Sequence, residues 1–153
     1  MRDNYDFSDG VKNPYFGKIS GKHIITGIDT ICKVLENARK GADFYLLIGD
    51  FLDEFYKAEQ MTQQAMINEP PAGNALENKQ EYLSFAAATT HKLANDYELS
   101  VPEWVFEKQH YYMQKPFFAC NATGDLRLLF MYKSPSEFKH RNLFVDENVL
   151  GRV

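Results

Sequence analysis

An apolar pattern between residues 44 and 55 constrains the fold of this chain more than any other feature. Large apolar side chains recur there at the i, i+3, i+4, i+7, i+8 and i+11 positions: Phe44, Leu47, Ile48, Phe51, Leu52 and Phe55. This spacing places all of them on one face of a helix and leaves Asp50, Asp53 and Glu54 outside. Asp43 stands where a helix cap is expected. The segment is therefore predicted to be an amphipathic helix packed on a core.

Breaker and cap residues predict further helices on both sides of this segment. One is expected from near Thr26 to Gly41, with Ile28, Ile31, Cys32 and Leu35 on its inner face, and a short one over 62–68, which Pro70 and Pro71 end. A long central helix is expected from Asn74 to about Asp96.

The last third of the chain shows weaker periodicity. A capped short helix carrying Trp104 and Phe106 is expected after Ser100, and residues 110–120 are expected to be irregular. Residues 125–133 fit neither a helical nor a strand period cleanly, and we favour helix. Ser134, Pro135 and Glu137 together are typical of a helix start, with Ser134 as the cap.

Length and composition favour one domain. The chain has 153 residues, of which 44% are hydrophobic and 14% aromatic, enough for one packed core. Residues 1–23 are polar and contain Gly10, Gly17 and Gly21, all breaker signals. We predict a mainly α protein, with a single compact helical domain over residues 24–153 and an extended N-terminal arm over residues 1–23.

The sequence predicts a cytoplasmic protein. Cys32 and Cys120 form neither a disulfide framework nor a zinc pattern, and the charged start lacks the apolar segment of a secretory signal. The longest strongly apolar run, residues 44–48, is far shorter than the roughly 20 residues that cross a bilayer. No membrane association is expected.

Charge is unevenly distributed along the chain. Residues 1–41 carry 7 Lys and Arg against 5 Asp and Glu, residues 42–107 carry 3 against 12, and residues 108–153 carry 7 against 4. The acidic middle can attract a basic partner and repel nucleic acid. The basic ends can attract nucleic acid and repel a basic partner. The charges can equally serve only to solvate helix surfaces.

No residue pattern specifies a reaction, a metal or a cofactor. The four histidines share no metal-ligand spacing with either cysteine, and the glycine-rich segment 17–23 departs from a phosphate-binding loop. Asp50, Asp53 and Glu54 can be explained as an exposed acidic face, and Cys32 as a buried and inert thiol. We therefore predict no catalytic residues, no metal and no cofactor, and a protein that is not an enzyme.

Two groups of side chains are candidate binding residues in the C-terminal half. Aromatic residues between 104 and 118 can stack nucleic-acid bases or, alternatively, belong to the core or to a protein-binding patch. The best polar candidate, suited to a carboxylate or phosphate, comprises Lys139, His140, Arg141 and Arg152. The same four side chains can instead anchor the C-terminal tail against acidic helices.

The leader resembles that of many small bacterial antitoxins. The resemblance rests on Tyr5-Asp6-Phe7-Ser8 followed by Asn13-Pro14-Tyr15. It implies an arm that folds onto a protein partner, with its anchors at Tyr5, Phe7, Asn13, Pro14, Tyr15 and Phe16. The alternative is a leader that folds back over its own core.

A second resemblance covers residues from about 51 to 153. Trp104-Val105, the run from Ser134 to Val145 and the closing Leu150-Gly151-Arg152-Val153 resemble an uncharacterised bacterial domain associated with toxin-antitoxin gene pairs. The chain has Lys139-His140 where two arginines are expected, and it lacks the helix-turn-helix of some relatives.

These observations favour a non-enzymatic, antitoxin-like or regulatory protein that binds and occludes a protein partner, such as a cognate toxin. The rival is a nucleic-acid-binding regulator that uses the basic ends of the chain: Lys12, Lys18, Lys22, Lys139, Arg141 and Arg152. A third hypothesis, an enzyme of unrecognised type, requires a pocket that joins His110 or His140 to a carboxylate and an arginine.

Overall fold

A computed structural model of the chain describes residues 29–71 and 79–152, and this part is mainly helical, as predicted. The longer helices are α2 (Ile31–Arg39), α3 (Phe44–Lys57), α4 (Gln60–Asn68), α5 (Gln80–Asp96) and α7 (Gly124–Lys133). The shorter helices are η3 (Glu103–Phe106), α6 (Lys108–Tyr111), η4 (Ala119–Asn121) and α8 (Ser136–Lys139). The strands β1 (Phe117–Phe118) and β2 (Leu143–Phe144) pair in parallel. None of the helices in this part combines the length and apolarity needed to cross a bilayer.

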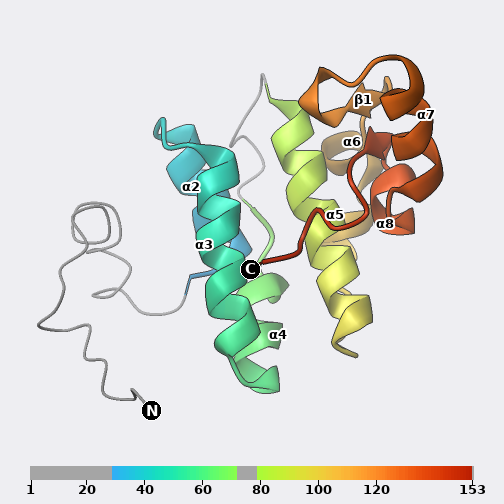
Figure 1. The fold of residues 1–153 in the computed structure, drawn as a ribbon. Coiled ribbons are helices and arrows are strands. Elements are labelled where there is room, and N and C mark those ends of the chain that lie inside the picture. Colours follow the sequence, from blue (N-terminus) through green and yellow to red (C-terminus); the bar gives the residue numbers. More distant parts are fainter. Residues whose placement is uncertain (1–28, 72–78, 153) are drawn as a thin grey trace, which may run out of the picture.

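Helix α5 lies at the centre of the fold. Figure 1 shows α2, α3 and α4 on one side of it, and α6, α7, α8 and the two strands on the other. The three consecutive alanines Ala86, Ala87 and Ala88 are fully buried, and their small side chains let neighbouring elements approach the α5 backbone closely. The core is therefore built around α5 from both sides.

The predicted helix of residues 44–55 is confirmed as α3. All six apolar side chains of the pattern are buried, and the Asp43 carboxylate accepts a hydrogen bond from the Leu46 N–H at 3.0 Å. Phe44 stacks on Tyr82 of α5, with ring centroids 4.3 Å apart, and meets the edge of Phe85. These contacts join α3 to α5.

Two predicted helix starts are wrong. Helix α2 begins at Ile31, because Thr30 is extended and its hydroxyl caps the Lys33 N–H, so Thr26 is not the cap. Helix α5 begins at Gln80, because Lys79 has a non-helical backbone; Asn74 therefore does not start it. The end of α2 is as predicted, with Gly41 at a φ of +102°, a conformation that glycine adopts without strain. The predicted boundary of the arm near residue 23 lies outside the described residues.

The C-terminal third differs from prediction mainly in its caps. Residues 125–133 are helical as favoured, but residues 110–120, expected to be irregular, include the end of α6 and strand β1. The helix after Ser100 is a 3-10 turn without a side-chain cap. Ser134 does not cap α8: its buried hydroxyl accepts from the Val145 N–H at 2.7 Å and faces the carbonyls of Phe130 and Val145. It thus joins the end of α7 to the tail.

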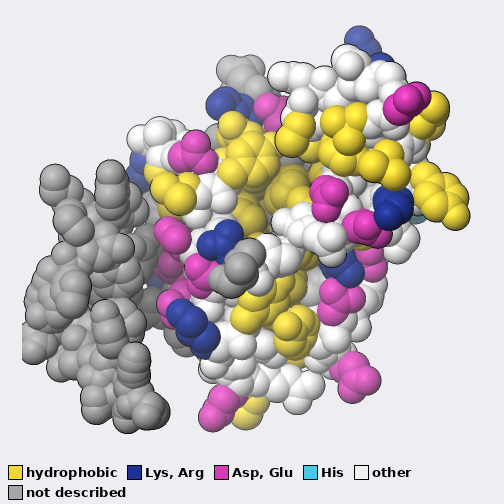
Figure 2. Space-filling model, in the orientation of Figure 1, with side chains coloured by type: hydrophobic (Ala, Val, Ile, Leu, Met, Phe, Trp, Pro, Cys, Tyr) yellow, Lys and Arg dark blue, Asp and Glu magenta, His cyan; other side chains and the backbone are white. Residues whose placement is uncertain are grey.

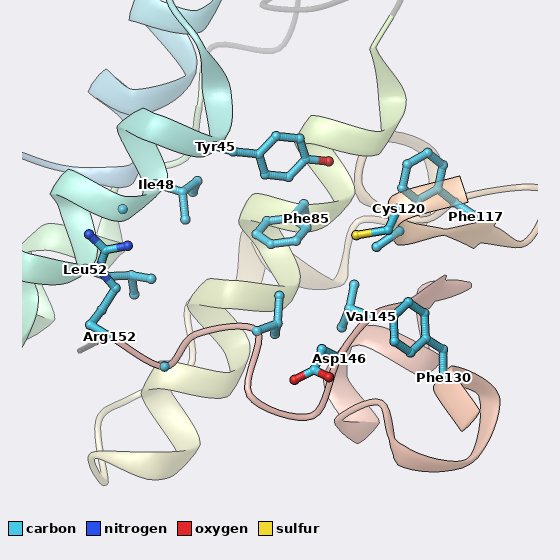
Figure 3. A pocket seen from close by; sticks show the side chains of 14 residues that line it. Tyr45, Ile48, Leu52, Phe85, Phe117, Cys120, Phe130, Val145, Asp146 and Arg152 are labelled. Atoms are coloured by element: carbon cyan, nitrogen blue, oxygen red, sulfur yellow. The ribbon is translucent and has the colours of Figure 1, made fainter. Parts of the chain in front are cut away.

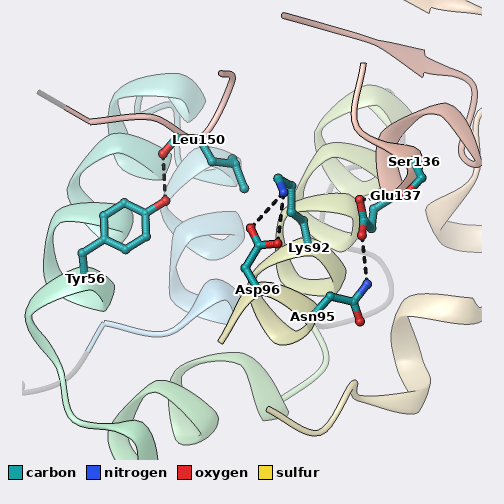
Figure 4. Close-up of polar contacts among 7 residues, drawn as sticks. All are labelled: Tyr56, Lys92, Asn95, Asp96, Ser136, Glu137 and Leu150. Carbon is teal, nitrogen blue, oxygen red and sulfur yellow. Dashed lines mark hydrogen bonds and ion pairs between the residues drawn. The ribbon is translucent and has the colours of Figure 1, made fainter. Parts of the chain in front are cut away.

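The tail after β2 runs back across α5 to α3. The Tyr56 hydroxyl of α3 donates a hydrogen bond to the Leu150 carbonyl at 2.8 Å (Figure 4). On the other side of α5, the Asn95 amide donates to the Glu137 carboxylate of α8 at 2.9 Å. The first bond ties the tail to α3, and the second ties α8 to α5.

Candidate functional site

Helix α7 is unusual because its apolar side chains point in all directions. Phe130 is its only buried residue, while five large apolar side chains are exposed: Leu126, Leu128, Leu129, Met131 and Tyr132. Leu128 is 63% exposed and Tyr132 is 81% exposed. A helix that is apolar on every side is normally covered on every side. The exposed side chains of α7 therefore form an apolar surface of the kind that marks an interaction site.

A pocket of about 400 Å³ lies beside this helix, between α3, α5 and the tail. Figure 3 shows Tyr45, Phe85 and Phe130 around it, with the Cys120 sulfur close to them. Most of its lining is apolar and includes Ile48, Leu52, Phe85, Phe117, Phe130 and Val145. Because Phe130 is the buried residue of α7, the pocket lies against the buried side of that helix, whereas Leu128 and Tyr132, two residues to either side of Phe130, project from the opposite side.

Four polar groups lie around the apolar lining: the Tyr45 hydroxyl, the Cys120 thiol, the Asp146 carboxylate and the Arg152 guanidinium. Burial and the neighbouring Tyr82 and Glu81 raise the pKa of Tyr45, so its hydroxyl stays protonated and can donate a hydrogen bond. Cys120 is exposed and has a φ of +56°. The pocket is thus of a size and composition that suit an apolar group with few polar contacts.

Arg152 closes one end of the pocket and anchors the tail to α3. Its guanidinium donates two hydrogen bonds to the Asp53 carboxylate, at 2.9 and 3.0 Å. The close approach depends on Gly49, because a Cβ at that position would lie 3.0 Å from the Arg152 Nη1. This contact is the tail anchor that the sequence left open as an alternative to anion binding.

Arg141 occupies a different place, on the far side of α5 from these groups. It is 0% exposed, and its guanidinium donates to the carbonyls of Val105 at 2.7 Å and Glu137 at 2.9 Å. It also lies 3.2 Å from the Nδ1 of His91 and over the ring of Tyr112. Within the described residues no carboxylate is hydrogen-bonded to it and its Nε has no partner. Arg141 therefore joins η3, α5 and α8, and is not accessible to a ligand.

The remaining two basic candidates lie at the surface near Arg141. The Lys139 ammonium donates to the Tyr132 carbonyl at 2.6 Å, at the end of α7. His140 is exposed, with its ring against the edge of Tyr112. The structure therefore brings Lys139, His140 and Arg141 to one end of α8, places Arg152 with α3, and commits three of the four side chains to contacts within the protein.

The His91–Arg141 contact makes stability depend on pH. Burial and the neighbouring guanidinium lower the pKa of His91 below its usual value of about 6.5, because the Nδ1 must stay unprotonated to accept from Arg141. The unfolded state then binds more protons than the folded state below about pH 6.5, so stability is present above that pH and is lost as pH falls. Urea unfolding at pH 7.5 and 5.5 should show a lower midpoint at pH 5.5. The variant His91→Asn, which keeps an acceptor, should weaken this dependence; an unchanged dependence would contradict the assignment.

The predicted arm contacts, Tyr5, Phe7, Asn13, Pro14, Tyr15 and Phe16, lie outside the described residues. Among the described residues no group of histidine, cysteine, aspartate and glutamate side chains is arranged to hold a metal ion. Cys32 is buried, as predicted, and its thiol lies 3.7 Å from the Glu36 carboxylate. In the aromatic band, Trp104 and Tyr111 are buried and Phe106 is exposed.

The pocket was not predicted from the sequence. Its lining comes from α3, α5, β1, η4, α7 and the tail, and no local sequence pattern indicates that these elements meet. The one available signal was the apolar segment 126–132, interrupted only by Arg127, whose apolar side chains are spread around the whole helix and not confined to one face. Comparison with protein-family models, with curated proteins and with solved structures finds no match.

Proposed function

We propose that the chain is a non-enzymatic, antitoxin-like or regulatory protein of the cytosol that binds and occludes a protein partner through the exposed side chains of α7, together with the N-terminal arm. The carrying observation is the set of five exposed large apolar side chains on the ten residues of α7. Apolar patches of this kind on a folded domain typically mark protein interaction sites. A cognate toxin is the kind of partner that the two resemblances imply.

The nucleic-acid alternative draws less support from the described residues. Three of its basic residues are already bound within the protein: Lys139 to a carbonyl, Arg141 in the core and Arg152 to Asp53. Phosphate binding needs cations that are free to displace counterions. The enzyme hypothesis also draws less support, because neither His110 nor His140 lines the pocket.

The proposal is tested by capturing the partner from the native host with the tagged full-length chain and measuring binding to the purified partner. The double variant Leu128→Gln/Tyr132→Gln should weaken binding by about tenfold or more, since central apolar contacts of an interface carry most of its energy. Both side chains are exposed, so the fold should tolerate the change.

Met61→Gln is the matched control, because Met61 is 87% exposed on α4, away from α7. It should bind the partner like the unchanged chain. Deleting residues 1–22 should also abolish binding if the arm contributes as proposed. A partner that binds the α7 variant as tightly as the control would contradict the assignment of α7.

A further inference from the structure

The outer side of α7 carries a stripe of four side chains at helical spacing. They stand at the i, i+3, i+4 and i+7 positions and are called here the α7 stripe: Asp125, Leu128, Leu129 and Tyr132. This spacing places them together on the side of the helix opposite the buried Phe130. Leu128 and Tyr132 are largely exposed, and Leu129 is 44% exposed. Figure 2 shows hydrophobic side chains at the surface over α7, with acidic and basic side chains between them.

The α7 stripe reads the same in both directions along the helix. From Asp125 to Tyr132 the intervals are three, one and three residues, with a polar group at each end and two leucines in the middle. If two such helices pack antiparallel, the leucines of one copy meet those of the other. The Tyr132 hydroxyl of each copy then meets the Asp125 carboxylate of the other. A two-fold symmetric interface requires this kind of self-complementarity.

The two polar ends of the stripe are available for such a contact. In the part of the chain that the structure describes, neither the Asp125 carboxylate nor the Tyr132 hydroxyl has a hydrogen bond or an ion pair. Within one copy they are seven residues apart, about 10 Å along the helix axis. An antiparallel copy supplies a hydroxyl donor to each carboxylate, so two charge-assisted hydrogen bonds form in each dimer.

Charge around the stripe is balanced. Arg127 lies over the Phe118 ring, away from the stripe, and the Lys133 ammonium is 2.9 Å from the Glu147 carboxylate. Among the described residues, the charged side chains on α7 or interacting with it are three cations and three carboxylates: Arg127, Lys133, Lys139, Asp125, Asp146 and Glu147. Two copies therefore meet here without strong repulsion, whereas nucleic acid finds no net attraction.

We propose that the chain associates with a second copy of itself through the α7 stripe, as an antiparallel pair of α7 helices. A stable dimer buries about 800 Å² on each partner. Helix α7 has only ten residues, a length of about 15 Å, so the pair is weak and dissociates readily. The proposed function assigns the same side chains to a protein partner. Self-association therefore covers them until that partner displaces the second copy, and this regulatory consequence rests on the proposed function.

Sedimentation velocity of the full-length chain tests the pair. Across protein concentrations from roughly 5 to 500 µM, the mass should rise from one chain to two, as for a weak dimer. Leu128→Gln/Tyr132→Gln should raise the dissociation constant of the dimer about tenfold or more. Met61→Gln, at an exposed position of α4, is the matched control and should dimerise like the unchanged chain.

A double-mutant cycle tests the antiparallel register. Tyr132→Phe removes the hydroxyl and Asp125→Ala removes the carboxylate, and each should raise the dissociation constant about fivefold or more. The combined variant should be within about twofold of the weaker single variant, because both changes break the same contact. Glu103→Ala, at an exposed position of η3, is the control for lost charge and should leave dimerisation unchanged. Far-UV circular dichroism should be the same for all variants.

Several results would overturn the proposal. A chain that stays monomeric at the highest concentration has no such pair, and a dimer that Leu128→Gln/Tyr132→Gln leaves intact uses another surface. Single effects that multiply in the combined variant would show that Asp125 and Tyr132 do not meet. Dimerisation that appears only after deletion of residues 1–22 would assign the cover of the stripe to the chain's own arm.

Failure here and failure of the proposed function are distinguishable, because self-association is measured on the purified chain alone. If the captured partner binds through α7 while the chain stays monomeric, the protein-binding function stands and self-association falls. If the chain dimerises through the stripe and no stoichiometric partner is captured, self-association stands and the proposed function falls. A complex with the partner that retains the α7 dimer would overturn displacement of the second copy.

Discussion

Replacing Arg141 by alanine should lower the free energy of unfolding by about 3–5 kcal/mol. The side chain is fully buried and donates to the carbonyls of Val105 and Glu137, which would lose these bonds without gaining water. Each buried polar group left unpaired costs about 1–3 kcal/mol, and the vacated volume adds a cavity cost. Because small domains are stable by only about 5–15 kcal/mol, this change should shift the urea midpoint strongly.

Arg152→Ala is the matched control, because it also removes one positive charge but at a partly exposed position. Its ion pair with Asp53 is partly exposed, and such pairs contribute about 0–1 kcal/mol. Arg141→Lys should fall between the two, because an ammonium cannot reproduce the planar fork that reaches two carbonyls. If Arg141→Ala lowered the free energy of unfolding by less than about 1 kcal/mol, the conclusion that Arg141 holds η3, α5 and α8 together would be refuted.

Replacing Phe44 by alanine should cost a similar amount, about 3–5 kcal/mol, the range measured for buried phenylalanine. Phe44 is 2% exposed and contacts Tyr82 and Phe85, so the change removes both its apolar burial and the ring contacts that join α3 to α5. Urea unfolding followed by circular dichroism should show a lower midpoint with an unchanged slope.

Phe44→Leu serves as the comparison for this prediction. It keeps most of the buried volume and loses the stacked ring, so it should be less destabilising than alanine. Equal losses for the two variants would indicate that ring stacking, and not filled volume, provides most of the contact. A loss below about 1 kcal/mol for alanine would contradict the role assigned to Phe44 in joining the two helices.

The elements that could be predicted from the sequence are helices that bury a single face, because their apolar residues then recur at a regular helical spacing. Helix α3 needs only one buried face, so its apolar spacing was sufficient to predict both the helix and its core residues. Helix starts were less predictable because several residues could serve as caps. Thr30 caps α2 in place of Thr26, and the hydroxyl of Ser134 binds Val145, 11 residues away, in place of capping α8.

The candidate site could be predicted only in part. Lys139, His140, Arg141 and Arg152 look alike in the sequence, but burial separates Arg141 from the others, and burial depends on how η3 and α8 pack on α5. The exposed face of α7 was present in the sequence as an apolar run, yet its exposure follows from what the rest of the chain leaves uncovered. The pocket depends on residues that are far apart in the sequence, from Tyr45 to Arg152.

The parallel pairing of β1 with β2 has a consequence for recognition. It closes residues 117–144 into a loop that contains α7 and α8, and Phe118 stacks on Phe144 where the loop closes, while Arg127 of α7 lies over the Phe118 ring. Helix α7 is thereby held near its start by the contact of Arg127 with Phe118 and at its end by the hydrogen bonds of Ser134. For the proposed partner, the backbone of α7 is already ordered before binding, so less conformational entropy is lost when a complex forms, and slow dissociation can follow from a small interface.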